Sequence, residues 1–376
     1  MHQPHRHRLN KASTMHALAA ALLGLSSSIA SAGVIYVTNS SELTAALAGA
    51  VAGQTIQLAD GTYNGNFTAT AVGTAAAPIR LVGSSNAVLT NSAGTGYGLY
   101  LNNAQYWDIS GFTVSNYLKG IVLDGSSYNT LENLTVNNID QEGVHFRKFS
   151  SYNTIQLSSI YDTGNGPGAS DAGFGEGVYI GSAYSNWATL TNGNPDASNY
   201  NRVISNHIGA NVRAEGVDIK EGTIGGLILN NTFDASGISG ANSADSVIDV
   251  KGSNYTLKGN VVINPALTSV MLDGFQVHVV KDSKSVNLAN SGTNNTFDGN
   301  SFNLNNAAGY GINVVGVSSG ATGNVVCRTN SVSGVDKGLS NVALSTCAQV
   351  DEPSPLALLM LGGLGIGAVR RYRRWS

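Results

Sequence analysis

Apolar and polar residues alternate over only a few positions at a time along most of the chain, and each short run ends at Gly, Asn or Ser. Alternation with a period of two is typical of a β-strand, and the residues that end each run favour turns. The longer spacing of a helix, with 3.6 residues per turn, is missing from the middle of the chain. The pattern therefore predicts many short strands joined by turns.

The strand pattern repeats at regular intervals. Segments 128–136, 152–160 and 200–208 each begin with Tyr-Asn and share one order of apolar and polar positions. A unit of about two dozen residues with three short strands forms one coil of a solenoid, whose inward Val, Ile, Leu and Phe stack on the neighbouring coils. We therefore predict an all-β fold, a right-handed parallel β-helix solenoid. The tyrosines that recur at the repeat interval are interpreted as structural: Tyr128, Tyr152 and Tyr200.

Residues 41–48, with the sequence SELTAALA, predict a short helix at the start of the folded body. A helix at the open end of a solenoid covers apolar surface that would otherwise face water. We therefore expect an N-terminal capping helix on a single folded unit, and we expect the protein to be a monomer.

The first 32 residues have the three parts of a secretory signal peptide: a basic stretch, an apolar run over 17–25, and the small residues of positions 30–32. Residues 33–350 are then the β-helix domain, with 13 basic and 21 acidic residues and a net charge of −8. General nucleic-acid binding needs a broad basic surface. The composition therefore argues against a nucleic-acid partner.

Residues 351–376 contain Glu352-Pro353, an apolar segment over 356–369 and a basic end with four arginines. This order resembles the PEP-CTERM sorting segment of Gram-negative bacteria. The resemblance implies that an exosortase-type machinery recognises and removes the segment, and that the protein reaches the cell surface, the extracellular matrix or the medium.

Cys327 and Cys347 are the two cysteines of the chain, and both lie late in the predicted β-helix domain. Export to an oxidising compartment would allow a disulfide that clamps the last coil. Two free thiols are the alternative, and the sequence leaves both open.

Five segments can be aligned by their apolar residues: 142–147, 176–181, 215–220, 246–251 and 273–278. Their third and fifth positions are apolar and should face the core, so the fourth and sixth positions should face outward. Neighbouring coils lie about 4.8 Å apart, which would place these residues in one continuous patch. The outward fourth position holds His145, Tyr179, Asp218, Asp249 and Gln276. The outward sixth position holds Arg147, Gly181, Lys220, Lys251 and His278.

Two interpretations of this charged patch are open. Alternating columns of Asp and Lys could keep an exposed sheet in solution without any further role. However, Asp218 beside Asp249 and Lys220 beside Lys251 place like charges on adjacent strands, which costs stability unless a ligand or metal relieves it. The like-charge pairs therefore favour a functional site.

The helix at 41–48, together with the segments that begin at Gly53 and Gly73, resembles the opening of β-helix polysaccharide lyases, particularly the chondroitinase B and alginate lyase family. The resemblance covers the cap and, in general form, the coils to about Asn330. It implies a pectate-lyase-like fold and β-elimination on an acidic polysaccharide that contains uronic acid. Such a reaction needs a neutralised substrate carboxylate, a base for the C5 proton and an acid for the leaving oxygen.

On this basis we expect Lys220 to be the base, with Lys251 as the second choice, because a neighbouring cation and partial burial lower a lysine pKa. The groups expected to neutralise or protonate are Arg147, Arg213 and His278. Oxygen ligands of the type that Ca²⁺ prefers are offered by Glu215, Asp218 and Asp249. Further substrate contacts are expected from His145, Tyr179, Gln276, Lys148 and Trp187. Segment 164–187 could wall the groove and stack Phe174 and Trp187 on sugar rings, or be a tolerated insertion.

Other functions fit the same scaffold. A polysaccharide epimerase or a glycoside hydrolase is the nearest alternative, and a hydrolase would use two carboxylates such as Asp218 with Asp249 or Glu215. A noncatalytic, carbohydrate-binding surface or matrix protein would suit the sorting segment. The fold does not decide among these functions, because function depends on the site.

Overall fold

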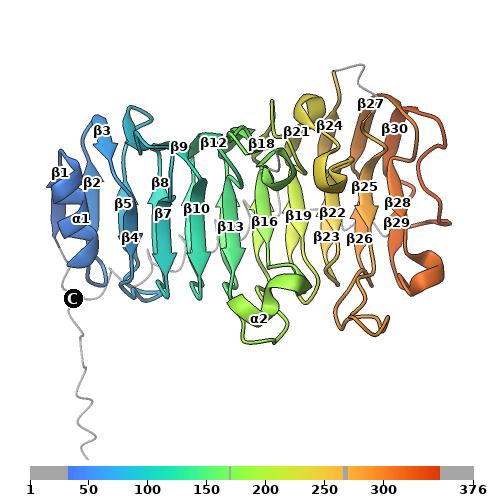
Figure 1. Cartoon of the computed structure of the whole chain (residues 1–376), viewed down its shortest axis with the longest axis horizontal. Helices are drawn as coiled ribbons and strands as arrows, with labels where there is room; N and C mark the ends of the chain where they lie inside the picture. The colour runs from blue at the N-terminus through green and yellow to red at the C-terminus, as the bar shows by residue number, and fades with distance from the viewer. Residues whose placement is uncertain (1–32, 169–170, 266–269, 348–376) are drawn as a thin grey trace, which may run out of the picture. The chain divides into compact units, whose positions relative to one another are not determined.

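The computed structural model describes residues 33–168, 171–265 and 270–347. They form three parallel sheets, and the chain visits the sheets in turn, once per coil. Figure 1 shows successive coils side by side, from β1 at one end to β28, β29 and β30 at the other. The predicted all-β parallel β-helix is confirmed.

The first sheet, sheet A, has the order β1 (Val34–Val37), β2 (Thr55–Leu58), β5 (Ile79–Val82), β8 (Trp107–Ser110), β11 (Thr130–Glu132), β14 (Thr154–Gln156), β17 (Arg202–Ile204), β20 (Leu227–Leu229), β23 (Thr256–Lys258), β26 (Thr296–Asp298), β29 (Val325–Cys327) and β31 (Leu344–Ser345). Sheet B has the order β3 (Gly61–Asn64), β6 (Ala87–Thr90), β9 (Thr113–Tyr117), β12 (Thr135–Ile139), β15 (Ser159–Thr163), β18 (His207–Ile208), β21 (Thr232–Asp234), β24 (Val261–Ile263), β27 (Ser301–Ala307) and β30 (Ser331–Val335). Sheet C has the order β4 (Phe67–Ala69), β7 (Tyr97–Asn102), β10 (Lys119–Asp124), β13 (Val144–Arg147), β16 (Val178–Ile180), β19 (Val217–Ile219), β22 (Ser246–Val250), β25 (Asp273–Val277) and β28 (Ile312–Val314).

The core consists of inward columns of apolar side chains. On sheet A the middle residue of each three-residue strand is fully buried, and these residues pair in register from coil to coil, as in Leu131, Ile155 and Val203. Full burial of such a side chain contributes about 1.5–3 kcal/mol. The sum over many coils, each packed on its neighbours, holds the solenoid together.

Polar side chains also form ladders at the turns. Asn153 Oδ1 accepts hydrogen bonds from the backbone N and the side-chain amide of Asn129, and Asn201 repeats this arrangement on the next coil. These buried asparagines satisfy turn backbone groups that would otherwise lack partners. Outside the core, the rings of Tyr128 and Tyr152 stack with centroids 5.0 Å apart, which confirms that the recurring tyrosines are structural.

The predicted capping helix is confirmed as α1 (Ser40–Ala48). Asn39 caps its N-terminus by accepting a hydrogen bond from the backbone N of Glu42. The buried face of α1, with Leu43, Ala46 and Leu47, closes the end of the core beside β1 to β4 (Figure 1). The other helices are short: η1 (Asp171–Phe174), η2 (Tyr184–Asn186), α2 (Trp187–Leu190), η3 (Ala235–Gly237), η4 (Ala241–Ser243) and η5 (Val317–Ser319).

None of the described helices is long and apolar enough to span a bilayer. The predicted signal peptide (1–32) and sorting segment (351–376) lie outside the described residues.

Cys327 and Cys347 form a disulfide, with their Cα atoms 5.5 Å apart, so the structure selects the disulfide alternative. The bond ties β29 to the chain just after β31, the last of the described strands. The disulfide therefore clamps the last described coil.

Replacing Cys347 by Ser should lower the free energy of unfolding by about 3 kcal/mol, because the disulfide closes a loop of 20 residues. Thermal unfolding with and without reductant measures this loss. Reduction should destabilise the wild type to the same extent and leave the variant unchanged. A variant as stable as the oxidised wild type would contradict the clamp.

Candidate active site

The outward residues of sheet C form the column that the sequence alignment predicts. His145, Tyr179, Asp218, Asp249 and Gln276 are successive partners in the strand register from β13 to β25. The column continues to Val122 on β10 and to Asn313 on β28. Figure 1 shows these strands side by side. The predicted patch is therefore continuous across five coils.

A cavity of about 910 Å³ lies over the part of this column that holds Tyr179, Asp218, Asp249 and Gln276. Lys220, Lys251 and His278 also line it. Its walls come from residues within 174–186, 242–245 and 279–281, which belong to connections after strands of sheets B and C. Segment 164–187, which follows β15, thus forms a wall of the groove, one of the two roles predicted for it.

The carboxylates of the fourth-position column neutralise the ammonium groups of the sixth-position column. Asp218 pairs with both Lys220 and Lys251, and the Lys251 contact measures 3.1 Å from Nζ to Oδ1. Lys251 also pairs with Asp249, while His278 Nε2 lies 2.8 Å from Gln276 Oε1 and 3.6 Å from Asp249 Oδ1. The like-charge pairs therefore need no ligand to relieve them.

The expected lowering of the lysine pKa values is wrong. Burial alone would lower the pKa of Lys220, but the carboxylates of Asp218 and Glu176 outweigh burial and raise it. Burial would also lower the pKa of Lys251, but the carboxylates of Asp218 and Asp249 outweigh burial and raise it. Both lysines are therefore ammonium ions in the free protein.

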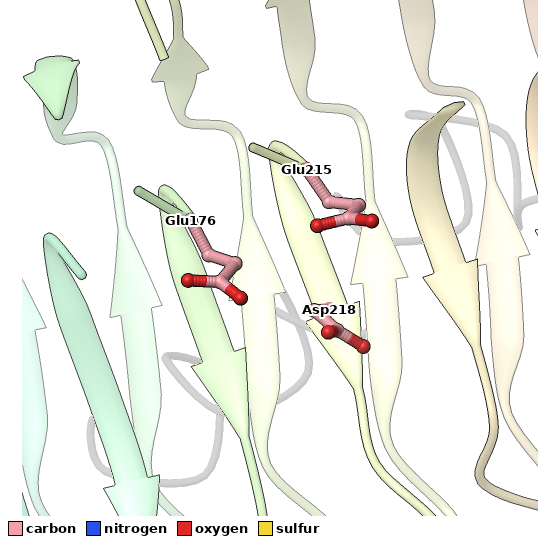
Figure 2. A group of neighbouring side chains, drawn as sticks. All are labelled: Glu176, Glu215 and Asp218. Carbon is pink, nitrogen blue, oxygen red and sulfur yellow. The ribbon is translucent and has the colours of Figure 1, made fainter. Parts of the chain in front are cut away.

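Three buried carboxyl groups converge beside the lysines. Each of Glu176, Glu215 and Asp218 offers an oxygen, and these oxygens all lie within 4.8 Å of one another. Figure 2 shows the two glutamates at the starts of neighbouring strands and Asp218 farther along β19. Glu176 Oε2 is buried without a hydrogen-bond partner among the described residues. This cluster differs from the predicted ligand set, because Glu176 takes the place of Asp249.

Burial and the neighbouring carboxylates raise the pKa of Glu176 well above its usual range, and burial and Asp218 raise the pKa of Glu215 to about 8. Asp218 behaves differently. Burial would raise its pKa, but Lys220 and Lys251 outweigh burial and lower it. The cluster therefore holds one ionised carboxylate and two carboxyl groups that favour the neutral form at neutral pH.

Replacing Glu215 by Gln should raise the melting temperature at pH 8 by about 2–4 °C. An acid whose pKa rises on folding contributes stability that is complete below its unfolded pKa, near 4.5, and is lost as pH rises through about 8. Glutamine mimics the neutral form, so the variant should lose less stability between pH 5 and 8. Glu132→Gln on sheet A is the matched control. Equal pH slopes for Glu215→Gln and wild type would contradict the raised pKa.

Tyr179 lies between His145 and Asp218 in the column. Its ring centroid lies 4.5 Å from the ring centroid of His145, and Lys220 Nζ lies 4.8 Å from the Tyr179 ring centroid. Burial, followed by the negative charges of Asp218 and Glu176, raises the pKa of the phenol. Tyr179 therefore offers a neutral hydroxyl beside an ammonium group.

A smaller cavity of about 250 Å³ adjoins the main one, and Phe174, Tyr179 and Asn186 line both. Two residues of the predicted columns line the smaller cavity, His145 and Arg147. Lys119 also lines this cavity and is not among the site residues predicted from the sequence. Lys119 pairs with Glu142 and occupies the first position of a sixth segment, 119–124, in which a lysine replaces the acid that most of the other segments carry there.

Three predicted site residues line neither cavity. Arg213 lies in the turn before β19, Lys148 is held by Asp124 with Nζ and Oδ2 2.8 Å apart, and Trp187 is only 4% exposed. Trp187 Nε1 donates a hydrogen bond to the carbonyl of Ser182 at 2.8 Å, so this indole anchors the wall from inside. The expected contact of Trp187 with sugar is therefore wrong, whereas Phe174 remains 42% exposed at the cavity.

Solved structures with related folds agree with this architecture. The alginate lyase from Paenibacillus sp. str. FPU-7 is 38% identical, with a TM-score of 0.70, and the match covers 84% of this chain and 97% of that one. Pectate lyase Pel9A matches with a TM-score of 0.57 and 19% identity over 88% of this chain and 85% of that one. A polygalacturonase from Erwinia carotovora ssp. carotovora matches with a TM-score of 0.50 and 13% identity over 82% and 96%. The last two show the fold alone.

The family model for the periplasmic copper-binding protein NosD matches residues 29–166. No curated protein matches the chain. The identity and coverage with the Paenibacillus enzyme are high over nearly the whole length of that enzyme. The chain therefore belongs to the same family of parallel β-helix proteins as the alginate lyase from Paenibacillus sp. str. FPU-7.

Proposed function

We propose that the protein is a polysaccharide lyase that cleaves a polymer of uronic acids, with alginate as the first candidate, by β-elimination in the main cavity. The observation that carries this proposal is the row of Tyr179, Lys220, Lys251 and His278 along the cavity of a chain 38% identical to an alginate lyase. The acidic polysaccharide would lie outside the cell, which agrees with the predicted signal peptide and exosortase-type sorting segment.

The base and the acid of an elimination must reach the same sugar, because the C5 proton and the leaving oxygen on C4 are on adjacent carbons. Tyr179 and Lys220 satisfy this condition, since they lie on neighbouring coils with Nζ 4.8 Å from the ring centroid. Tyr179 and His278 do not, because they are separated by three coil steps of about 4.8 Å each.

We assign Lys220 as the base and Tyr179 as the acid. Asp218 pairs with two ammonium groups, so it keeps Lys251 as a partner when Lys220 gives up its proton. The neutral amine of Lys220 removes the C5 proton, the C4–O4 bond breaks as the C4–C5 double bond forms, and the Tyr179 hydroxyl protonates O4. The raised pKa of Tyr179 keeps this hydroxyl protonated.

Lys251 is the group that neutralises the carboxylate of the reacting sugar, because it is charged in the free protein and follows β22, the strand next to the β19 strand that Lys220 follows. His278 lies one coil farther along the same edge of the cavity, where it can contact the neighbouring sugar. Neutralisation makes the C5 proton more acidic, because the developing negative charge spreads into the carboxyl group. Arg147 does not share this task, since it lies in the smaller cavity, and Arg213 lies outside both.

Within the part of the chain that the structure describes, Glu176, Glu215 and Asp218 offer a set of oxygen ligands for Ca²⁺, and Glu176 Oε2, which has no hydrogen-bond partner there, fits an oxygen donor to a cation. When bound there, Ca²⁺ would add positive charge near the substrate carboxylate. The proton transfers assigned to Lys220 and Tyr179 use the side chains of the protein alone.

A glycoside hydrolase is supported less well. Asp218 and Asp249 both accept from lysines, and the lowered pKa of Asp218 makes it unsuitable as a general acid. Glu215 could supply the acid, but its carboxylate oxygen lies within 4.8 Å of that of Asp218. An inverting hydrolase needs roughly 6.5–9.5 Å between its carboxyl groups to admit a water. A retaining hydrolase needs roughly 5–5.5 Å, but its nucleophile would be Asp218, which is already paired with two lysines.

The test is incubation of the purified 33–350 body with alginate, pectate, glucuronan and glycosaminoglycans, in calcium and in chelator. Elimination gives an unsaturated product that absorbs in the ultraviolet, with a new reducing end for each cut. New reducing ends without absorbance would indicate hydrolysis. Neither signal on any polymer would overturn the proposed enzyme and favour a carbohydrate-binding surface protein.

A further inference from the structure

We propose that the smaller cavity is a second binding subsite for a uronate, which holds a sugar of the same polymer beyond the one that reacts. The inference rests on the proposed function and extends it along the solenoid axis. The two cavities share Phe174, Tyr179 and Asn186, so a single chain of sugars can pass from one to the other.

Arg147 lines this cavity. Its Nε and Nη2 donate to the carboxylate of Asp124, and Nη2 also lies 3.2 Å from the Tyr97 hydroxyl. Nη1 has no hydrogen-bond partner among the described residues, which leaves it for a ligand. Asp124 therefore holds Arg147 in a fixed orientation that suits a carboxylate from the cavity side.

The charge balance separates the two cavities. Of the Asp, Glu, Lys and Arg side chains, Lys119, Arg147 and Glu142 line the smaller cavity. Burial would raise the pKa of Glu142, but His145 and Lys119 outweigh burial and lower it to about 2, so Glu142 balances Lys119, its ion-pair partner. Asp124 pairs with both Arg147 and Lys148, so these five side chains together keep one net positive charge, which favours an anionic sugar.

The rest of the lining has the composition of a sugar site. Phe174 is 42% exposed at the boundary between the cavities, where its ring can stack against a sugar face. Residues with amide or hydroxyl side chains also line the smaller cavity: Gln141, Ser182 and Asn186. An exposed aromatic ring with a few polar groups is the usual lining of a small-molecule pocket.

The spacing assigns Arg147 and Lys220 to different sugars. Arg147 follows the register of β13 and Lys220 that of β19, with β16 between them. Two coil steps amount to roughly 10 Å, which is more than one sugar ring spans. The polymer therefore crosses the strands of sheet C, and the Arg147 subsite recognises a carboxylate outside the reaction centre.

The experiment compares Phe174→Ala and Arg147→Gln with wild type on oligouronates of increasing length. We expect the KM of long oligomers to rise about tenfold with kcat nearly unchanged, while the shortest cleaved oligomer is affected much less. Phe149→Ala is the matched control, because Phe149 is 45% exposed and lines neither cavity. Circular dichroism checks folding, and Phe174→Ala carries the test if Arg147→Gln is unstable.

Binding to the same oligomers in a Lys220→Ala background separates this inference from the proposed reaction. Calorimetry should show about tenfold weaker binding when Phe174→Ala is added to that background. If the wild type proves to cleave none of the polymers, the same loss of affinity would support the subsite and overturn only the proposed reaction. Active enzyme with unchanged KM in both variants, or a Lys220→Ala protein that binds no uronate, would overturn the subsite.

Discussion

Replacing Lys220 by Ala should lower kcat on the cleaved polymer by at least about 10³-fold, as expected when a general base is removed. The amine that accepts the C5 proton is lost, while Asp218 keeps its contact with Lys251, so the fold should survive. The rate at which ultraviolet absorbance increases measures the loss of kcat. Lys258→Ala is the matched control, because Lys258 pairs with Asp298 on sheet A, outside both cavities.

The pH dependence of the cleavage rate gives a second test of Lys220 as the base. The pKa of Lys220 is raised, so at neutral pH only a small fraction of Lys220 is the free amine. Each unit of pH below that pKa should lower the rate about tenfold, and activity should rise into the alkaline range. A Lys220→Ala variant within tenfold of wild type, or a wild-type rate that falls above pH 7, would place the base elsewhere.

Replacing Tyr179 by Phe should lower kcat by about 10²–10⁴-fold and change KM little. The substitution removes one hydroxyl and retains the ring that contacts His145 and Lys220. Initial rates over a range of polymer concentrations separate kcat from KM. Tyr161→Phe is the control, because the Tyr161 hydroxyl accepts a hydrogen bond from Asn137 on sheet B, away from the site.

If Tyr179 only binds substrate, the same variant should raise KM and leave kcat near that of the wild type. That result would reassign the acid and would leave Lys220 as the base. A loss of both kcat and thermal stability would instead indicate a structural role. The measurement therefore distinguishes the role proposed here from the substrate contact expected from the sequence.

The order of residues along the candidate site could be predicted without the structure. Apolar third and fifth positions fix which side chains face outward, because a strand alternates its faces with a period of two. The strand register confirms that His145, Tyr179 and Asp218 are neighbours, although they are 34 and 39 residues apart in the chain. A repeat that stacks coil upon coil turns sequence alignment directly into spatial adjacency.

The protonation states could not be predicted in this way. The sequence places Lys220 beside Lys251, which suggests mutual repulsion, but long side chains from one column reach the carboxylates of the other. Glu176 and Glu215 are recognisable as acids, yet their raised pKa values depend on the depth of burial and on the absence of a paired cation among the described residues.

The sequence by itself determined the solenoid, its capping helix and the outward columns of sheet C, because these depend on local alternation and on a repeat. Only the tertiary structure decided the ionised states of the lysines, the disulfide, the carboxyl cluster and the two cavities. It also removed Arg213, Lys148 and Trp187 from the site. These features depend on turn conformation, burial and the reach of long side chains across coils, which no local pattern of residues encodes.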